Sequence, residues 1–223
     1  MSINIAIDGP AGAGKSTIAK KLAKELSFIY VDTGAMYRAM ALYFLEHQIL
    51  PSDEDAISGA CREVNITIAY ENGEQQVLLN DVNVNGKIRR EEVGNMASAT
   101  SIYPAVRTKL VELQQELASK TDVIMDGRDI GTCVLPNAQV KIYLTASVET
   151  RAGRRYDELT EKGVKCDLKA IEKDIEERDY RDMNREMSPL KQAEDAVLVD
   201  SSNLDVEGVV TVIRGIYEEK CRS

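Results

Sequence analysis

The chain has 223 residues, of which 43% are hydrophobic and 29% are charged, and its formal net charge is −9. This composition is typical of a globular protein and excludes a largely disordered chain. The length corresponds to roughly one and a half average domains, which favours one compact unit with an insertion. The acidic balance excludes a broad cationic face for nucleic acid or anionic lipid, so any anion site must be local.

Three features of the sequence bear on the cellular location of the protein. The longest apolar run, residues 39–45, has about seven residues, whereas a membrane-spanning helix needs about 18. The N-terminal segment has no basic stretch, and Asp8 stands where a signal peptide is apolar. The 4 cysteines are scattered without a Cys-x-x-Cys pair, which indicates neither a zinc site nor a disulfide framework. We therefore expect a cytoplasmic protein with no membrane partner.

The N-terminal part predicts two strand–loop–helix units in succession. Residues 3–7 alternate in hydropathy, residues 8–14 are rich in glycine, and apolar residues then recur at helical spacing up to Leu26. A short apolar run at 28–31 begins the second unit, which continues with helical spacing from Met36 to Phe44.

The next segment changes to the period of a β-strand. A helix start at 52–55 is followed by alternating runs at 65–70 and 76–79, which flank Asn72-Gly73. An Asn-Gly pair between alternating runs is a hairpin signal. With a short third strand within 80–86, the sequence predicts a small antiparallel insert at about residues 63–88.

Helices and buried strands alternate in the rest of the chain. Helical patterns cover 90–101 and 104–118, and further helices are expected from Ser147, from Leu168 and from Asp205. The apolar runs at 122–125, 140–144 and 196–199 are typical of buried strands. This alternation predicts an α/β fold with a parallel sheet.

The glycine-rich segment carries the most specific motif of the sequence. Residues 9–16, GPAGAGKS, fit G-x-x-x-x-G-K-[ST] and lie between a predicted strand and a predicted helix. In that context the loop presents backbone N–H groups and a helix N-terminus to phosphates, and the lysine adds a positive charge. A plain glycine turn is the alternative, and the strand–helix context argues against it. We expect ATP to bind at Gly9, Pro10, Ala11, Gly12, Ala13, Gly14, Lys15, Ser16 and Thr17.

A magnesium ion is expected beside this loop. The Ser16 hydroxyl can hold Mg²⁺, and Asp126, at the end of the 122–125 strand, is the matching carboxylate for the metal or its waters. The alternative for Asp126 is an ordinary aspartate at a strand end.

A phosphate loop alone leaves switches, motors and kinases open. The Asn-Lys-x-Asp motif of regulatory GTPases is missing, since its nearest approach is Ser119-Lys120-Thr121-Asp122, and no Leu-Ser-Gly-Gly-Gln signature occurs. Arginines instead recur at helical spacing in two sets, namely Arg151, Arg154 and Arg155, and then Arg178, Arg181 and Arg185. Guanidinium groups bind phosphate in a bidentate manner, so these sets favour a second phosphorylated substrate. Pairing with nearby carboxylates stays open for Arg151 and Arg155.

Four segments, residues 9–17, 32–38, 126–132 and 178–185, together resemble the bacterial cytidylate kinase family over essentially the whole chain. The resemblance implies a P-loop kinase core with a five-stranded parallel sheet flanked by helices, a small antiparallel insert and a short helical lid. It places the core at about 1–35, 105–150 and 188–223, the monophosphate-binding insert at about 36–104 and the lid at about 151–187. It also implies transfer of the γ-phosphoryl group of ATP, with Mg²⁺, to CMP or dCMP.

The resemblance further implies roles for individual residues. The acceptor phosphate would be bound by Arg38, Arg128 and Arg185, and the cytosine by Ser98, Arg107 and Asp129. The acceptor's sugar or phosphate would contact Asp32, Arg178 and Asp182. The lid would contribute Arg154, with Arg151 or Arg155, so that the catalytic set is Lys15, Arg128, Arg154, Arg178 and Arg185.

The single histidine has no place in this chemistry. A phosphate monoester with a second pKa near 6 is mostly deprotonated at pH 7, so the acceptor needs no general base. His47 lies at helical spacing from Tyr43 near a predicted helix end, which indicates a packing or capping role. A kinase for another monophosphate or small metabolite and a nucleotide-dependent switch remain as alternatives. We expect a monomer that binds nucleotides and no nucleic acid.

Overall fold

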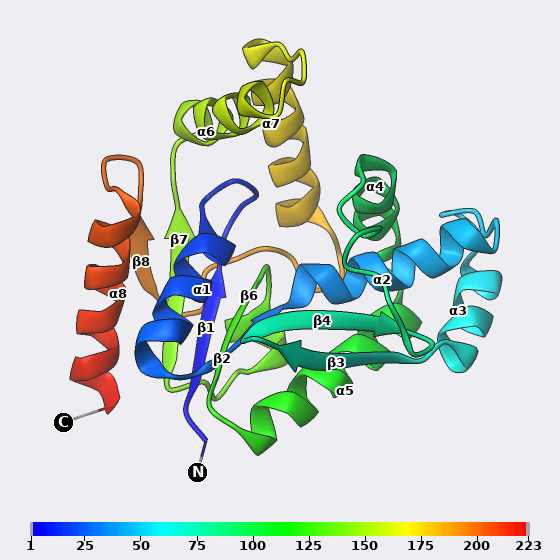
Figure 1. Ribbon diagram of the computed structural model, residues 1–223, viewed down its shortest axis with the longest axis horizontal. Coiled ribbons are helices and arrows are strands. Elements are labelled where there is room, and N and C mark those ends of the chain that lie inside the picture. The colour runs from blue at the N-terminus through cyan, green and yellow to red at the C-terminus, as the bar shows by residue number, and fades with distance from the viewer. Residues whose placement is uncertain (1, 222–223) are drawn as a thin grey trace. The chain divides into compact units, whose positions relative to one another are not determined.

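The structure is a computed structural model that describes residues 2–221, and it has a central parallel sheet (Figure 1). Its strands are β1 (Asn4–Asp8), β2 (Ile29–Asp32), β6 (Val123–Gly127), β7 (Val140–Thr145) and β8 (Val197–Asp200), in the order β2-β6-β1-β7-β8. In the parallel β1–β7 pair Ile7 lies opposite Ile142, and both side chains are buried. Strands covered by helices on both faces read as nearly continuous apolar runs, as these do. The five-stranded parallel sheet is confirmed.

Contacts divide the chain into two compact units. The first comprises Ile3–Phe28 and the chain from Ile124 onward, and the second comprises Ile29–Val123. The finer division into core, insert and lid stays a prediction. Among residues 2–221 no helix combines the length and the apolar character needed to cross a membrane.

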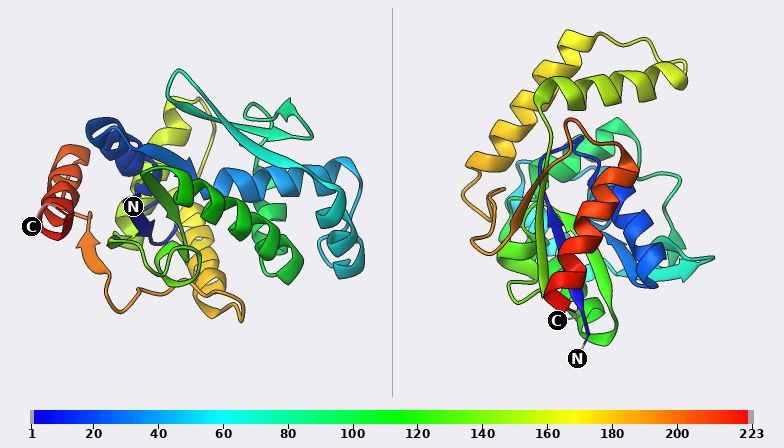
Figure 2. Two further views of the ribbon diagram at one scale, coloured as in Figure 1. Left: turned by 90° about the horizontal axis from the view of Figure 1, so that it is seen from below. Right: turned by 90° about the vertical axis from the view of Figure 1, so that its left-hand side faces the viewer.

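In the first unit, helices cover the sheet and also form a separate pair. Helices α1 (Lys15–Leu26) and α8 (Val206–Cys221) pack on each other, and they contact β1 and β7 respectively (Figures 1 and 2). Helices α6 (Val148–Glu161) and α7 (Leu168–Asn184) pack together around Ala152, Ile171 and Ile175. A π-helical turn, η1 (Ile130–Val134), follows β6.

The second unit contains β2, four helices and a small antiparallel sheet. The helices are α2 (Thr33–Glu46), α3 (Glu54–Glu63), α4 (Glu91–Thr100) and α5 (Pro104–Lys120). Strands β3 (Ile66–Glu71), β4 (Glu74–Leu79) and β5 (Val82–Asn83) form an antiparallel sheet. Asn72 and Gly73 have φ angles of 54° and 79°, and a two-residue hairpin turn of type I′ requires positive φ at both of these positions. The predicted antiparallel insert is confirmed.

Candidate active site

The phosphate loop connects β1 to α1, in the local order that the sequence predicts. Gly9 has a φ of 150°, and a Cβ atom there would lie 1.9 Å from the carbonyl oxygen of Leu144, so no larger residue fits. Gly14 precedes α1 with a φ of 89°, a conformation that favours glycine. The glycines therefore allow the chain to turn tightly between a buried strand and the N-terminus of a helix.

The first side chain of α1 folds back over this loop. Lys15 is buried, and its Nζ donates hydrogen bonds of 2.8 Å to the carbonyl oxygens of Gly9 and Pro10. The ammonium group is thereby held inside the loop whose N–H groups are suited to phosphates.

Several charged groups of the first unit surround Lys15. Burial lowers its pKa well below the ordinary value, and the guanidinium groups of Arg128 and Arg178 lower it further. The carboxylates of Asp126 and Asp8 act in the opposite direction. Three cationic side chains thus lie close enough to repel one another, an arrangement that an anionic ligand would stabilise.

The two predicted metal ligands lie together. The Ser16 hydroxyl donates a hydrogen bond of 2.9 Å to Oδ2 of Asp126, which is buried near the end of β6. Within the described residues, no cluster of three or more His, Cys, Asp or Glu side chains could hold a metal ion. Mg²⁺ is commonly held by one or two protein oxygens together with substrate phosphates and water, and this pair of oxygen donors fits that pattern.

Asp182 of α7 lies near three arginines that the sequence predicts to bind the acceptor nucleotide. Nε of Arg128 donates a hydrogen bond of 2.8 Å to Oδ2 of Asp182. Burial raises the pKa of Asp182, but the guanidinium groups of Arg128, Arg178 and Arg185 outweigh it and hold the pKa below its usual value. The structure therefore brings these four predicted site residues together.

Arg185 caps the C-terminal end of α7. Its backbone N–H donates to the carbonyl of Arg181 at 3.1 Å, and its Nε donates to the carbonyl of Ser188 at 2.8 Å. Its Nη2 lies 3.8 Å from Oδ1 of the buried Asp129. Arg181 is exposed on the surface of α7. The use of Arg178, Arg181 and Arg185 for a phosphorylated substrate stays a prediction.

Arg151 of α6 has a carboxylate partner. Its guanidinium donates to the carbonyl oxygens of Ala146 at 2.9 Å and Ala11 at 3.0 Å, and Nη1 lies 2.6 Å from Oδ2 of Asp179. The side chains of Arg151 and Asp179 are only 4% and 11% exposed. The pairing interpretation that the sequence left open thus applies to Arg151, which braces the phosphate loop through the Ala11 carbonyl.

The other two arginines of α6 have different surroundings. Arg154 donates to the backbone oxygen of Ser201 at 2.7 Å and to its hydroxyl at 3.1 Å, and a Cβ on Gly14 would lie 3.9 Å from Arg154 Nη1. Arg155 forms an exposed ion pair of 2.7 Å with Glu158 on the same helix. Arg154 is therefore the arginine of this set that lies against Gly14, the residue before α1.

In the second unit, predicted residues gather at the start of α2. The carboxylate of Asp32 accepts a hydrogen bond of 2.9 Å from the N–H of Ala35, capping the helix, and one of 2.7 Å from Arg89. A Cβ on Gly34 would lie 3.2 Å from Arg38 Nη1 and 3.3 Å from Asp32 Oδ1. Arg38 and Asp32 therefore lie against the same glycine.

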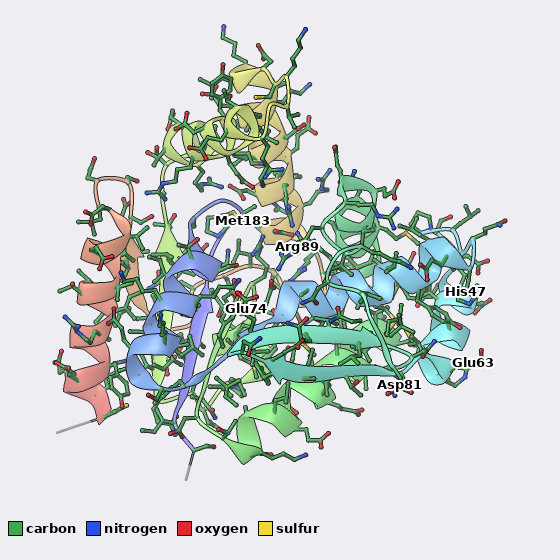
Figure 3. The ribbon with its side chains drawn as sticks, in the orientation of Figure 1. His47, Glu63, Glu74, Asp81, Arg89 and Met183 are labelled. Carbon is green, nitrogen blue, oxygen red and sulfur yellow. The ribbon has the colours of Figure 1, made fainter. Side chains whose placement is uncertain are left out.

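The small sheet anchors this group. The side-chain amide of Gln75 accepts from the N–H of Asp32 at 2.7 Å and donates to its carbonyl at 3.2 Å. Figure 3 labels the neighbouring Glu74, which is the first residue of β4. Gln75 and Arg89 are not among the predicted site residues, because neither belongs to a recognised motif and both bond to a residue more than 40 positions away.

Two further predicted base-binding residues also belong to the second unit. Arg107 is buried on α5, where only 5% of it is exposed. Ser98 is half-buried on α4, and its carbonyl accepts from the Ser101 hydroxyl.

His47 has the structural role that the sequence predicts. His47 caps the C-terminal end of α2 (Figure 3), whereas Asp32 caps the N-terminal end, and Nδ1 of His47 lies 2.8 Å from the carbonyl oxygen of Tyr43. The two rings are stacked with centroids 3.9 Å apart. A capping and packing role accounts for both contacts.

Comparisons with a family model and with known proteins point to the same family. The cytidylate kinase family model matches residues 5–219. A cytidylate kinase from Lactobacillus johnsonii is 50% identical over 218 residues, which cover 98% of this chain and 95% of that protein. A cytidylate kinase from Streptococcus pneumoniae is 48% identical over 220 residues, covering 98% and 99%.

A solved structure supports the fold. An uncharacterized protein from Eubacterium ventriosum aligns with a TM-score of 0.56 at 13% identity, covering 97% of this chain and 99% of that chain. At this identity the likeness bears on the fold alone. The family model and the sequence relatives, by contrast, match nearly the full length at high identity. The chain belongs to the cytidylate kinase family.

Proposed function

We propose that the residue groups described above carry out the reaction of this family in the present chain. The protein is a nucleoside monophosphate kinase that transfers the γ-phosphoryl group of ATP to CMP or dCMP, giving CDP or dCDP and ADP. The assignment of individual residues to steps of this reaction is our proposal.

The observation that carries the assignment is the gathering of positive charge beside the phosphate loop. Lys15, Arg128 and Arg178 lie close enough for the two arginines to lower the pKa of the lysine. Phosphoryl transfer needs positive charge where the transferred group and its neighbours carry negative charge. We therefore assign Lys15 to the ATP phosphates, together with the backbone of residues 9–17.

Mg²⁺ is proposed to accompany ATP. Ser16 and Asp126 would hold the ion or its waters, since both offer oxygen atoms beside the phosphate loop. When bound, the ion would neutralise charge on the phosphate oxygens.

The acceptor nucleotide is assigned to the remaining residues. Its phosphate is bound by Arg38, Arg128 and Arg185, its base by Ser98, Arg107 and Asp129, and its sugar or phosphate by Asp32, Arg178 and Asp182. Arg154 contributes the lid guanidinium. No general base is required, because the acceptor oxygens are mostly deprotonated at neutral pH, and catalysis then rests on positioning and charge neutralisation.

The experiment compares CMP and UMP as acceptors. Cytosine offers an amino donor and a ring-nitrogen acceptor where uracil does not, and a carboxylate such as Asp129 accepts hydrogen bonds only. Asp129→Ala should lower kcat/KM for CMP more than for UMP, and so narrow their ratio. Arg38→Ala, at a phosphate contact common to both nucleotides, should lower both about equally.

Either ratio can contradict the assignment. An unchanged CMP-to-UMP ratio in the Asp129 variant would remove that residue from base recognition. A changed CMP-to-UMP ratio in the Arg38 variant would show that Arg38 does not bind the phosphate alone.

A monomeric state and a cytoplasmic location stay predictions, which size measurement in solution and fractionation of cells would test.

A further inference from the structure

Asp8 has no role in the mechanism above, yet both oxygens of its carboxylate are used. It ends β1 directly before Gly9 and is only 5% exposed. Oδ1 accepts a hydrogen bond of 2.7 Å from the N–H of Ile130, and Oδ2 accepts one of 2.7 Å from the N–H of Gly131. These partners are 122 and 123 positions away in the sequence. Hydrogen bonds of this length to an ionised acceptor are among the stronger ones in proteins.

The two N–H groups belong to the first turn of η1. The first N–H groups of a helical turn have no partner within it and require a cap. Asp129 precedes η1, but its side chain does not cap this turn, and Asp8 does so from β1. A Cβ on Gly131 would lie 3.3 Å from Oδ2 of Asp8 and 3.2 Å from Cδ of Lys141. Glycine at this position therefore allows the close approach.

The capped turn follows two proposed site residues directly. Arg128 bonds to Asp182, and Asp129 lies 3.8 Å from Arg185. The Asp8 carboxylate thus ties the chain that carries Arg128 and Asp129 to the residue before the phosphate loop. A misplacement of about 1 Å in a reacting group can cost about 100-fold in rate, so a link of this kind has catalytic consequences.

We infer that Asp8 is a positioning residue of the phosphoryl transfer, which fixes Arg128 and Asp129 relative to the phosphate loop by capping η1. The inference rests on the proposed roles of Arg128 and Asp129. Asp8 itself contacts backbone N–H groups and is not a catalytic residue.

The test is Asp8→Asn, which keeps the size of the side chain. An amide has one acceptor oxygen, so it can cap one N–H group, and its NH₂ group opposes the other. We expect kcat with CMP to fall by about 10- to 100-fold and the CMP-to-UMP ratio to narrow, while the variant remains folded. Asp53→Asn is the matched control, because Asp53 caps α3 through the N–H of Ala56 at 3.0 Å, and it should leave both quantities unchanged.

A merely structural cap predicts a different result. Asp8→Asn would then unfold at lower urea concentration but keep the wild-type kcat and the wild-type CMP-to-UMP ratio, and this outcome would overturn the inference. If Asp8→Asn does not fold, Gly131→Ala tests the same link, since its methyl group presses on the Asp8 carboxylate without removing charge. Wild-type kcat and ratio in a folded Gly131→Ala variant would likewise overturn the inference.

Parallel variants separate this inference from the proposed function. If Arg128→Ala and Asp129→Ala leave turnover and acceptor choice unchanged, the proposed residue roles fail. If those variants are impaired and Asp8→Asn is not, only the positioning role of Asp8 fails. Non-additive losses in the Asp8→Asn/Asp129→Ala double variant support coupling between the two positions, and additive losses contradict it.

Discussion

Removing Arg151 should destabilise the protein strongly. Its guanidinium contacts Asp179 at 2.6 Å and donates to the carbonyls of Ala11 and Ala146. In Arg151→Met the Asp179 carboxylate stays buried without its cation. The other oxygen of that carboxylate, Oδ1, already lacks a hydrogen-bond partner in the part of the chain that the structure describes, so no second donor compensates.

The expected cost follows from this burial. Breaking a buried ion pair by removing one partner typically costs about 3–5 kcal/mol, because the remaining charge is left uncompensated. Replacing both partners by apolar residues is often neutral. Arg151→Met/Asp179→Leu should therefore recover most of the stability that Arg151→Met loses. Because the total stability of a protein is typically about 5–15 kcal/mol, a loss of this size should clearly lower the urea concentration at which Arg151→Met unfolds.

The assay is urea unfolding of the wild type, both single variants and the double variant, followed by circular dichroism. The coupling free energy comes from the double-mutant cycle. A loss below about 1 kcal/mol in Arg151→Met, the range of exposed pairs, would refute the buried-pair argument. The kcat of the stable double variant then tests whether Arg151 itself takes part in the reaction. A value near wild type leaves the lid role to Arg154, whereas a loss of several orders of magnitude would place Arg151 on the transferred phosphoryl group.

Two further predictions concern the chemistry. Lys15→Ala should abolish turnover while the circular dichroism spectrum stays native, because the ammonium meets charge that develops on the transferred group; near-wild-type kcat would contradict the assignment of the ATP phosphates. His47→Gln should keep its activity from pH 6 to pH 8, since the His47 side chain bonds to the carbonyl of Tyr43 and stacks on its ring; a kcat profile that collapses in a folded variant would show that a base is needed after all.

The parts of the site that the sequence predicts are those whose geometry is local. Residues 9–16 form their loop between adjacent elements, so the motif and its flanking hydropathy patterns together define the conformation. The hairpin at Asn72-Gly73 is predictable for the same reason, because the two turn residues and the two strands are contiguous. Arg155 pairs with Glu158 three positions along one helix, within the reach that helical spacing describes.

Contacts between distant segments could not be predicted in this way. Helical spacing places Arg151 on a face of α6, but it does not say that α7 supplies Asp179 to that face. The partners of Asp8 follow from the position of β1 beside η1, which depends on strand order rather than on any local pattern. From the sequence alone, Asp8 is indistinguishable from an ordinary aspartate at the end of a strand, because its two N–H partners, Ile130 and Gly131, are distant in the sequence.

The same carboxylate predicts how stability depends on pH. Burial, and to a smaller extent the charge of Asp129, raises the pKa of Asp8 from 3.8 to about 6, although the N–H groups of Gly131 and Ile130 and the Lys15 ammonium oppose the rise. Tyr143 is a further titratable neighbour. Folded protein therefore binds this proton more tightly than unfolded protein, so the contribution of Asp8 is fully present below pH 3.8 and is lost as the pH rises through 6.

The rise in the pKa of Asp8 from 3.8 to about 6 corresponds to a free energy of about 3 kcal/mol, since each tenfold change in proton affinity is worth about 1.4 kcal/mol. Asp8→Asn does not titrate, so subtracting its free energy of unfolding from that of the wild type isolates this contribution from the other groups. The difference should fall by about 2.5 kcal/mol between pH 4 and pH 7, because part of the full loss already occurs below pH 4. A difference that is constant over this interval would show that the pKa of Asp8 is not raised in the folded protein, and a difference that rises with pH would show that the pKa is lowered because the two N–H bonds outweigh burial.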